Sequence, residues 1–400
     1  MDSIRFGIIG LGGMGSYHAA HMEKLDHAIL AAVCDTDPAR IERITSPTVQ
    51  KFDKYQDLIG SGTVDAVLIA TPHYFHPEIS IAAMEKGLHV LCEKPIAVGI
   101  KQARQVNEAY ERLVRSNPRL KFGIMFQQRT IALYRKLREL IADGDLGQIT
   151  RVTWLVTDWF RTWAYYASGG WRATWAGEGG GVLLNQCPHN LDLIQWITGL
   201  TPRRVTAVAS IGKTHPIEVE DEVSAIFEYP NGAIGHFITT TGEAPGTNRL
   251  EICGDHGKIV AEHGKLQFTR TRKSVKQVRE TSREAFARME AWEIEVPLRP
   301  PHSPPPRDDQ HQRITENFIR AIRKDEPLIA PGVEGAAALE LGNAIQMSGL
   351  TGRPVELPVD GEQFEQFLRD MTRQYGGRKA VHANAPDSAS ANMAASFARP

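Results

Sequence analysis

A glycine-rich turn that directly follows an apolar run is the feature that most limits how this chain can fold. Residues 10–15 read G-L-G-G-M-G and match the pattern G-x-G-x-x-G. The apolar run 4–9 precedes them, and a segment with helical spacing at 13–24 follows. A strand, this turn and a helix in that order predict the first crossover of a dinucleotide-binding fold.

Each glycine of this turn has its own physical role. Gly10 permits the tight turn, Gly12 lets backbone amides approach a pyrophosphate, and Gly15 lets the helix pack close to the strand. The helix also offers unpaired N–H groups and a partial positive charge to phosphates. The alternative is a glycine turn without a ligand. We expect these residues to bind a dinucleotide: Gly10, Gly12, Gly13, Met14 and Gly15.

An acidic residue stands where the ribose of a dinucleotide would be recognised. Asp35 lies twenty residues after Gly15, at the end of the second predicted strand. A carboxylate there accepts hydrogen bonds from the ribose hydroxyls and repels a 2′-phosphate. The next three residues, 36–38, contain no arginine that could receive such a phosphate. The pattern favours NAD over NADP; the alternative is an aspartate that only caps a helix.

The first third of the chain alternates between two patterns. Segments with helical spacing, such as 77–86 and 100–114, separate short apolar runs of strand length. Such alternation predicts right-handed crossovers and a parallel sheet with helices on both faces. We therefore expect an α/β, doubly wound Rossmann domain over residues 1–127. Its predicted strands are 4–9, 29–34, 66–70, 89–92 and 122–125.

The pattern changes after a predicted helix at 133–141. Alternating segments now follow one another, and Asn231-Gly232 between two of them is a strong hairpin signal. One predicted helix, 182–197, interrupts them. This predicts an α+β domain over 128–358, built on a large open antiparallel sheet that binds substrate and forms the oligomer. The predicted strands are 149–157, 205–211, 223–229, 233–241, 250–253 and 258–260.

The last part of the chain reads as connections and an appendage. Residues 297–307 are rich in proline and predict a surface linker, and helical patterns follow at 314–323 and 333–349. Residues 359–400 are expected to form a partly disordered extension. From about residue 376 it is rich in Ala, Ser and Asn, so we expect no catalytic role there.

Charge and composition exclude several partners. The formal net charge is -1, and no basic stripe with interleaved aromatics predicts nucleic-acid binding. No apolar run reaches the length of a membrane span. The residues before the first strand do not resemble a secretion signal, so we expect a cytoplasmic protein. The four cysteines are scattered, and the pairs His18/His21 and His73/His76 lack a third ligand nearby, so we expect neither disulfides nor a metal.

Three further motifs resemble one enzyme family. Glu93-Lys94-Pro95 follows a predicted strand, residues 71–76 read T-P-H-Y-F-H, and residues 179–192 read G-G-G-V-L-L-N-Q-C-P-H-N-L-D. With the glycine turn, these make residues 4–358 resemble the glucose–fructose oxidoreductase and inositol dehydrogenase (Gfo/Idh/MocA) family. The resemblance implies an NAD-dependent oxidoreductase that forms homodimers or homotetramers. It adds these residues to the cofactor site: Thr71, Pro72, His73, His76, Glu93 and Lys94.

The same resemblance implies a catalytic group made of Lys94, His189 and residue 185. A histidine titrates near neutral pH and suits proton transfer, whereas a lysine before proline is held extended at the end of a parallel strand. Asn185 departs from the aspartate that the family usually carries. An amide can bind a sugar hydroxyl but brings no negative charge to its neighbours. The alternative is an ordinary surface lysine and a core histidine.

A long loop at 158–178 precedes the catalytic motif. It holds four of the chain's seven tryptophans, and flat aromatic rings can cover the C–H face of a sugar. Arginines there can donate to hydroxyls or to an anion. A subunit contact is an equally good explanation of the loop. If the loop binds substrate, we expect Arg161, Tyr165, Trp171 and Arg172 to join Lys94, Asn185 and His189 in that site.

Three functions fit these residues. The first is oxidation of a secondary hydroxyl of a sugar or cyclitol, such as an inositol or a pyranose, with NAD. The second is glycoside hydrolysis by transient oxidation, elimination, water addition and re-reduction, as in relatives within the family. The third is a nucleotide-binding regulator without chemistry, against which the presence of Lys94 and His189 argues. We expect the first.

Overall fold

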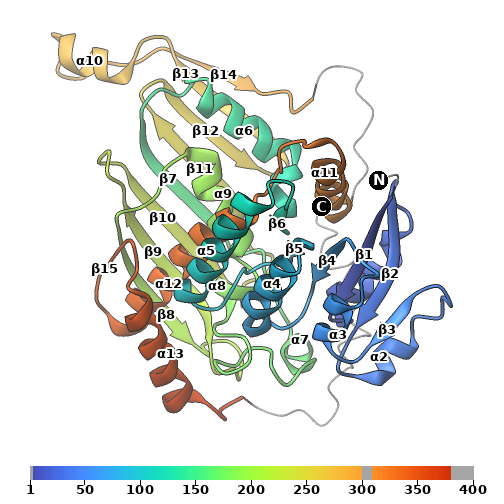
Figure 1. The fold of residues 1–400 in the computed structure, drawn as a ribbon. Coiled ribbons are helices and arrows are strands. Elements are labelled where there is room, and N and C mark those ends of the chain that lie inside the picture. The colour runs from blue at the N-terminus through green and yellow to red at the C-terminus, as the bar shows by residue number, and fades with distance from the viewer. Residues whose placement is uncertain (1–2, 300–308, 380–400) are drawn as a thin grey trace.

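The computed structural model describes residues 3–299 and 309–379 of the chain. It has two parts, each built on one sheet (Figure 1). The first sheet holds six parallel strands in the order β3-β2-β1-β4-β5-β6. These strands are β1 (Ile4–Ile9), β2 (Ala28–Cys34), β3 (Gln50–Phe52), β4 (Ala66–Ile69), β5 (His89–Cys92) and β6 (Phe122–Ile124).

Apolar runs form the centre of this first sheet because both of its faces are covered. Every residue of β4 is buried, which is expected of a central parallel strand. The order confirms the predicted doubly wound fold, in which ligands bind beyond the carboxyl ends of the strands. Its helices are α1 (Gly13–Met22), α2 (Pro38–Glu42), α3 (Tyr55–Gly60), α4 (His76–Glu85) and α5 (Ile100–Ser116), with a 3₁₀ turn, η1, at His73–Phe75.

The second sheet is a mixed sheet whose described strands run in the order β14-β13-β12-β11-β7-β10-β9-β8-β15. The predicted hairpin at Asn231-Gly232 joins β9 and β10, which pair antiparallel. Strands β7 and β10 pair parallel, so the sheet is not wholly antiparallel as predicted. The strands are β7 (Ile149–Val156), β8 (Arg204–Ile211), β9 (Glu220–Glu228), β10 (Ile234–Thr240), β11 (Asn248–Gly254), β12 (Gly257–Glu262), β13 (Lys265–Thr271), β14 (Ala291–Glu295) and β15 (Val355–Glu356).

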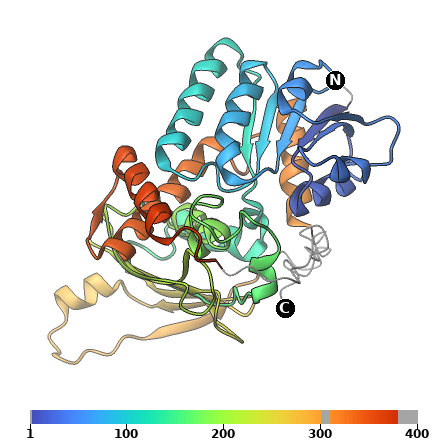
Figure 2. The same cartoon turned by 90° about the horizontal axis from the view of Figure 1, so that it is seen from below.

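Helices cover one face of this second sheet and leave the other open. Alternation along the strands places Phe227 and Phe237 in the core, whereas Val208 and Ile226 on the opposite face are 71% and 45% exposed. Sheet and helices form separate layers when the molecule is seen from below (Figure 2). The helices and 3₁₀ turns of this part of the chain are η2 (Gln127–Thr130), α6 (Ala132–Ala142), α7 (Trp163–Ala167), α8 (Val182–Asn185), α9 (Pro188–Thr198), α10 (Val275–Thr281), η3 (Gly332–Glu334), α12 (Gly335–Thr351) and α13 (Gly361–Tyr375).

The helix predicted at 182–197 is two helices. Helix α8 ends at Asn185 and α9 begins at Pro188. A proline has no N–H for the preceding turn and is favoured at the first position of a new helix, which accounts for the break. The break lies between the two predicted catalytic positions of this segment, residues 185 and 189.

The chain returns to the first sheet after the second sheet is complete. Helix α11 (Gln310–Lys324) places Phe318 against Phe6 of β1, with ring centroids 6.4 Å apart. Helix α13 forms from the first part of the predicted extension, and residues 380–400 lie outside the described residues. The predicted linker at 297–307 also lies mostly outside them.

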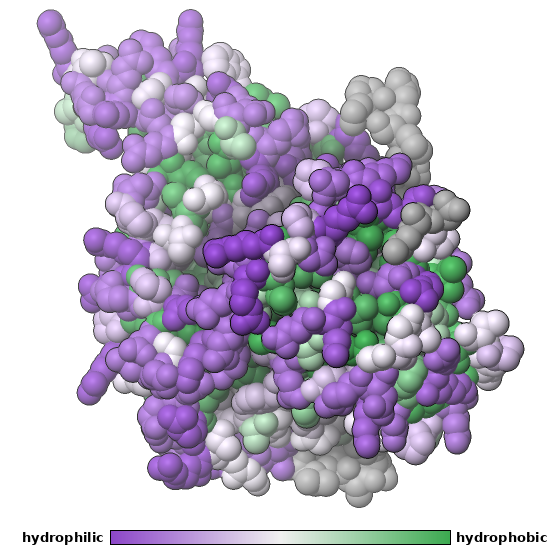
Figure 3. Space-filling model, in the orientation of Figure 1, coloured by the Kyte–Doolittle hydropathy of each residue, from purple (hydrophilic) through white to green (hydrophobic). Residues whose placement is uncertain are grey.

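Strands β13 and β14 and helix α10 form an arm that extends from the second sheet (Figures 1 and 2). Hydrophilic residues cover most of its visible surface (Figure 3). Three apolar side chains on it are nevertheless exposed: Phe286 at 95%, Trp292 at 54% and Ile294 at 40%.

Candidate active site

The glycine turn between β1 and α1 has the backbone geometry that its sequence predicts. Gly10 has a φ of 90°, a left-handed conformation that favours glycine. A Cβ at Gly15 would lie 1.7 Å from the carbonyl oxygen of Gly10, so only glycine permits this approach. Around Gly12, by contrast, there is open space, and no side chain caps the amino terminus of α1. The turn therefore fits a pyrophosphate at its amide groups.

Asp35 is held at the edge of this turn. Its carboxylate accepts hydrogen bonds from the backbone N–H of Leu11 at 2.6 Å and of Asp37 at 2.9 Å. This position suits a carboxylate that binds ribose hydroxyls. The expectation that no arginine lies nearby is wrong, because Arg40 on α2 lies 3.5 Å from Asp35. The search over 36–38 missed it because the first turn of α2 brings residue 40 back toward the strand end.

The residues of the 71–76 motif connect the loops around the first sheet. The ring of His76 is buried between two carbonyl oxygens, those of Pro95 at 2.7 Å and Thr71 at 2.8 Å. His73 lies 3.2 Å from the carbonyl oxygen of Glu178 and packs edge-on against Trp171. Burial lowers the pKa of His73 well below its ordinary value, which favours the neutral ring. The motif thus joins the predicted cofactor loops to the predicted substrate loop.

Glu93 and Lys94 follow β5 and face different partners. The carboxylate of Glu93 is buried and lies 2.8 Å from the ring of His18 on α1. Burial alone would raise the pKa of Glu93, but the hydrogen bond with His18 outweighs it, and the pKa is lowered. Lys94 is only partly buried, and the Lys94–Pro95 peptide bond is cis.

Lys94 reaches across to the second part of the chain. Its ammonium group donates a 2.7 Å hydrogen bond to the carbonyl oxygen of Asn185, at the end of α8. Burial lowers the pKa of Lys94, and the nearby charges of Arg172 and Arg161 add to this effect, while Glu93 and Glu178 oppose it. The structure therefore brings together two catalytic candidates, residues 94 and 185, that are 91 positions apart in sequence.

His189 lies in the first turn of α9 and is only 4% exposed. The side-chain amide of Gln127 lies 3.2 Å from its Nε2, and the ring of Phe126 packs edge-on against it. One turn further along α9, Asp192 accepts a 2.8 Å bond from Nε of Arg129, in the same η2 segment as Gln127. This buried ion pair fixes α9 against the segment that contacts His189.

The four substrate-loop candidates divide into two contacts around one tyrosine. Arg161 and Arg172 both stack on the ring of Tyr165, with guanidinium carbons 5.0 Å and 4.5 Å from its centroid. Arg172 also donates to the Tyr165 hydroxyl at 2.7 Å and lies 4.9 Å from the ring centroid of Trp171. The Tyr165 hydroxyl donates in turn to the side-chain oxygen of Asn185 at 3.3 Å. The loop thus joins the catalytic group.

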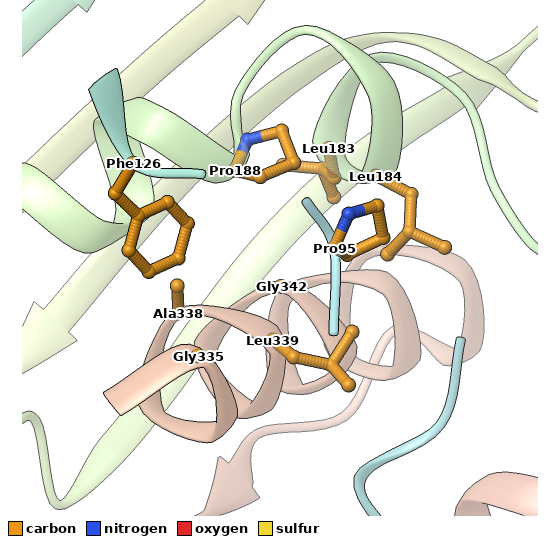
Figure 4. A pocket seen from close by; sticks show the side chains of 9 residues that line it. All are labelled: Pro95, Phe126, Leu183, Leu184, Pro188, Gly335, Ala338, Leu339 and Gly342. Atoms are coloured by element: carbon orange, nitrogen blue, oxygen red, sulfur yellow. The ribbon is translucent and has the colours of Figure 1, made fainter. Parts of the chain in front are cut away.

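A small apolar cavity lies behind this group (Figure 4). Pro95 and Pro188 face it from two loops, and α12 forms its floor. These prolines are neighbours of Lys94 and His189 in sequence. The lining side chains carry no polar atoms, so the cavity does not suit a sugar and belongs to the packing that supports the site. The remaining lining residues are Phe126, Leu183, Leu184, Gly335, Ala338, Leu339 and Gly342.

Sequence reasoning missed three residues at this site besides Arg40. Gln127 contacts His189, and Glu178 accepts a hydrogen bond from the side-chain amide of Asn185. Lys379, in the segment expected to have no part in the site, donates to the carbonyl oxygens of Gly169 and Arg172 at 2.8 Å and 2.7 Å. Glu178 directly precedes the glycine triplet, and that position was the one available signal.

Within residues 3–299 and 309–379, no cluster of three or more His, Cys, Asp or Glu side chains could hold a metal ion. The histidine pairs noted in the sequence bind other protein groups: His18 pairs with Glu93, and His76 with two carbonyl oxygens. None of the described helices is long and apolar enough to cross a membrane. All four cysteines are free thiols.

Comparison with known proteins yields matches to both parts of the chain. Residues 4–116 match an oxidoreductase family with an NAD-binding Rossmann fold, and residues 134–260 match the GFO/IDH/MocA C-terminal domain. The chain is 26% identical to the myo-inositol 2-dehydrogenase of Thermotoga maritima over 370 residues, which cover 88% of this chain and 98% of that one.

Two further relatives bear on the chemistry. The WlbA dehydrogenase of Bordetella pertussis, solved with NADH and UDP-GlcNAcA, is similar with a TM-score of 0.71 at 26% identity. The similarity covers 90% of this chain and 100% of that chain. A glycosyl hydrolase family 109 protein of Shewanella pealeana is 28% identical over 190 residues, which cover 44% of this chain and 40% of that protein.

Proposed function

Because the chain belongs to the Gfo/Idh/MocA family of NAD-dependent oxidoreductases, we propose that it oxidises a secondary hydroxyl of a sugar or cyclitol to a ketone. The observation that carries the proposal is the hydrogen bond between Lys94 and Asn185. It joins the carboxyl end of a parallel strand, where such folds bind their ligands, to the segment that holds His189. The relative from Thermotoga maritima, a myo-inositol 2-dehydrogenase, supports the choice of substrate class.

The protein's first task is to hold the cofactor. NAD supplies the hydride acceptor at its nicotinamide ring when it is bound. The amides of the glycine turn, residues 10–15, would hold its pyrophosphate, and Asp35 would accept hydrogen bonds from its ribose. The proposed cofactor site comprises Gly10, Gly12, Gly13, Met14, Gly15, Asp35, Thr71, Pro72, His73, His76, Glu93 and Lys94.

The protein's second task is to manage the proton of the reacting hydroxyl. Lys94 is positioned to donate a hydrogen bond to the carbinol oxygen, and His189 is the group that takes the proton as the ketone forms. A buried, partly apolar site strengthens both interactions because solvent screens them less. Asn185, between them in the network, would bind a neighbouring hydroxyl of the substrate.

The substrate side rests on the loop around Tyr165. Trp171 and Tyr165 provide flat apolar surface for ring C–H groups, and Arg161 and Arg172 provide donors for hydroxyls. The network from Arg172 through Tyr165 to Asn185 supports a substrate role over a subunit contact, because it ends on a catalytic candidate. The two functional units would comprise residues 1–127 for the cofactor and 128–358 for substrate and assembly.

The open face of the second sheet supports assembly into a homodimer or homotetramer. Val208, Ile226 and Ile234 are exposed on it, and apolar residues gathered on one face are typical of subunit contacts. Reduced thiols on all four cysteines fit the reducing cytoplasm, where we place the protein.

Redox-neutral cleavage of a glycoside is the second candidate. The partial match to a glycosyl hydrolase family 109 protein favours it, although that match covers 40% of the hydrolase. The oxidation step would be the same. The resulting ketone would acidify a neighbouring C–H, a base would then expel the aglycone, and water addition and re-reduction would follow.

A substrate panel tests the proposed function. The purified enzyme and NAD would be offered cyclitols, neutral pyranoses, uronates and glycosides, with NADH absorbance and product both followed. We expect NADH and a ketone from at least one cyclitol or sugar. Failure of every polyol, with NAD bound, would contradict the proposal.

A further inference from the structure

Glu178 is a buried glutamate that faces the catalytic group and has no role in the function proposed above. It is 1% exposed and directly precedes the glycine triplet 179–181. One carboxylate oxygen accepts a hydrogen bond from the side-chain amide of Asn185, and the other accepts from the backbone N–H of Ala173 at 2.6 Å. Since both oxygens act as acceptors, the contacts fit the ionised carboxylate.

The contact with Glu178 explains why residue 185 is an asparagine. Its side-chain oxygen accepts from the Tyr165 hydroxyl at 3.3 Å, which leaves the NH₂ group to donate to Glu178. An aspartate at this position, as the family usually carries, would place two carboxylates in contact, and like charges that close disfavour ionisation of both. A carboxylate at 178 therefore requires a hydrogen-bond donor at 185.

The charge of Glu178 acts mainly on cations at the site. Lys94, Arg172 and Lys379 all lie within its electrostatic reach, as does the hydroxyl of Tyr166. In the described part of the chain, neither Lys94 nor Arg172 has a carboxylate within salt-bridge distance. Glu93, the other acid near Lys94, is already paired with His18.

We propose that Glu178 is a positioning residue that supplies the negative charge missing from position 185, so that Glu178 and Asn185 together replace one aspartate. Through Asn185 it orients the amide toward the substrate. Its charge keeps Lys94 as an ammonium group that donates to the substrate oxygen. The reaction is the one in the proposed function, on which this inference rests.

Two observables follow from this role. Burial already lowers the pKa of Lys94, and the charge of Glu178 opposes that effect, so its removal lowers the pKa of Lys94 further. Lys94 would then lose its proton at a lower pH than in the wild type. In turnover, loss of a hydrogen bond to a charged group should reduce kcat by about 10- to 100-fold.

The first test needs neither substrate nor cofactor. Lysine amines of the cofactor-free enzyme are reductively methylated across a pH series, and the peptide that contains Lys94 is quantified by mass spectrometry. We expect Glu178→Gln to shift the labelling of Lys94 to lower pH. Glu218→Gln, which changes a buried glutamate outside this network, is the matched control and should keep the wild-type profile. An unshifted Lys94 profile in Glu178→Gln overturns the proposal.

The second test exchanges the two groups and uses a substrate found in the panel. Glu178→Gln and Asn185→Asp should each lower kcat, whereas the double variant restores a carboxylate–amide pair and should exceed both single variants. A double variant no better than Glu178→Gln would overturn the proposal. If Glu178→Gln does not fold, Glu178→Asp keeps the charge and shortens the reach, so it should retain the Lys94 profile and lose turnover. A shifted Lys94 profile in Glu178→Asp contradicts the role of the charge. Because labelling is read without turnover, an unfruitful panel would leave this result standing.

Discussion

Two buried glutamates lie on either side of Lys94, and they represent the two halves of the molecule. Glu93 belongs to the cofactor half and is paired with His18 at 2.8 Å, which lowers its pKa. Glu178 belongs to the substrate half and is held only by amide N–H groups, and burial raises its pKa. The first charge is neutralised within its own half of the protein, whereas the second remains available to the reaction centre.

The same contrast holds for how the two halves are encoded. The cofactor site is made largely of backbone in one contiguous turn, so its chemistry follows from local sequence. The substrate site is made of side chains from the end of β5, the loop 158–178 and the α8–α9 break. Backbone sites tolerate little substitution, while side-chain networks can exchange members. Substitutions should therefore separate the two halves experimentally.

The largest expected effect is at the reaction centre. Lys94→Ala and His189→Ala should each lower kcat by about 10²- to 10⁴-fold, the range expected for a positioned acid or base. NAD affinity, measured by calorimetry, should change little, because the pyrophosphate and ribose contacts lie in the other half. Lys86→Ala, at an exposed lysine that ends α4, is the control and should keep wild-type turnover. Near-normal turnover in either variant would remove that residue from the mechanism.

Cofactor choice comes second. Asp35→Ser should weaken NAD binding by about 10- to 100-fold, because hydrogen bonds to a charged group are lost. It should also narrow the gap to NADP, since Arg40 then faces the 2′-phosphate without its carboxylate partner. The double variant Asp35→Ser with Arg40→Ala should lose that gain in NADP affinity. Wild-type enzyme that binds both cofactors equally would contradict the role of Asp35.

A smaller effect is expected at the wall of the substrate half. Arg172→Ala should raise KM by about tenfold through loss of charged hydrogen bonds, with NAD affinity unchanged. Light scattering gives the oligomeric state of the same sample, which we expect to match the wild type. Dissociation into subunits with normal kinetics would instead assign the loop to a subunit contact.

The smallest effect concerns stability and again distinguishes the halves. Glu220 on β9 accepts hydrogen bonds from the N–H groups of Gly181 and Leu183, and burial raises its pKa to about 7. Between its ordinary pKa and about 7, the folded protein binds more protons than the unfolded chain. The free energy of unfolding should therefore fall as pH rises through this range. Glu220→Gln should show a shallower fall in Tm between pH 5 and 8, and an identical slope would contradict the assignment.

Much of the fold could be predicted from sequence because its signals are local. Strand β1 matched its predicted bounds, since an apolar run before the glycine turn leaves no other structure. Strand β3 was missed because Gln50–Phe52 is short and mostly polar. The parallel pairing of β7 with β10 could not be predicted either, because it joins strands separated by two helices and two other strands.

The site divides in the same way. The residues of the glycine turn lie together as their spacing predicts, whereas Arg40, Gln127 and Glu178 were not found. Each of them reaches the site only through a tertiary contact: a helix turn beside β2, the η2 segment against α9, or the fold of the loop onto Asn185. The unusual Asn185 was visible in the sequence, but its partner was not.

The central claim is net oxidation of a polyol by NAD, and its stoichiometry tests it most directly. The enzyme would be incubated with a substrate from the panel and with a matching chromogenic glycoside, in D₂O, while NADH, ketone and free aglycone are quantified together. We predict one NADH for each ketone, with no aglycone released. Sustained release of aglycone over many turnovers without net NADH, and with exchange of the hydrogen at C2 for deuterium, would contradict this account.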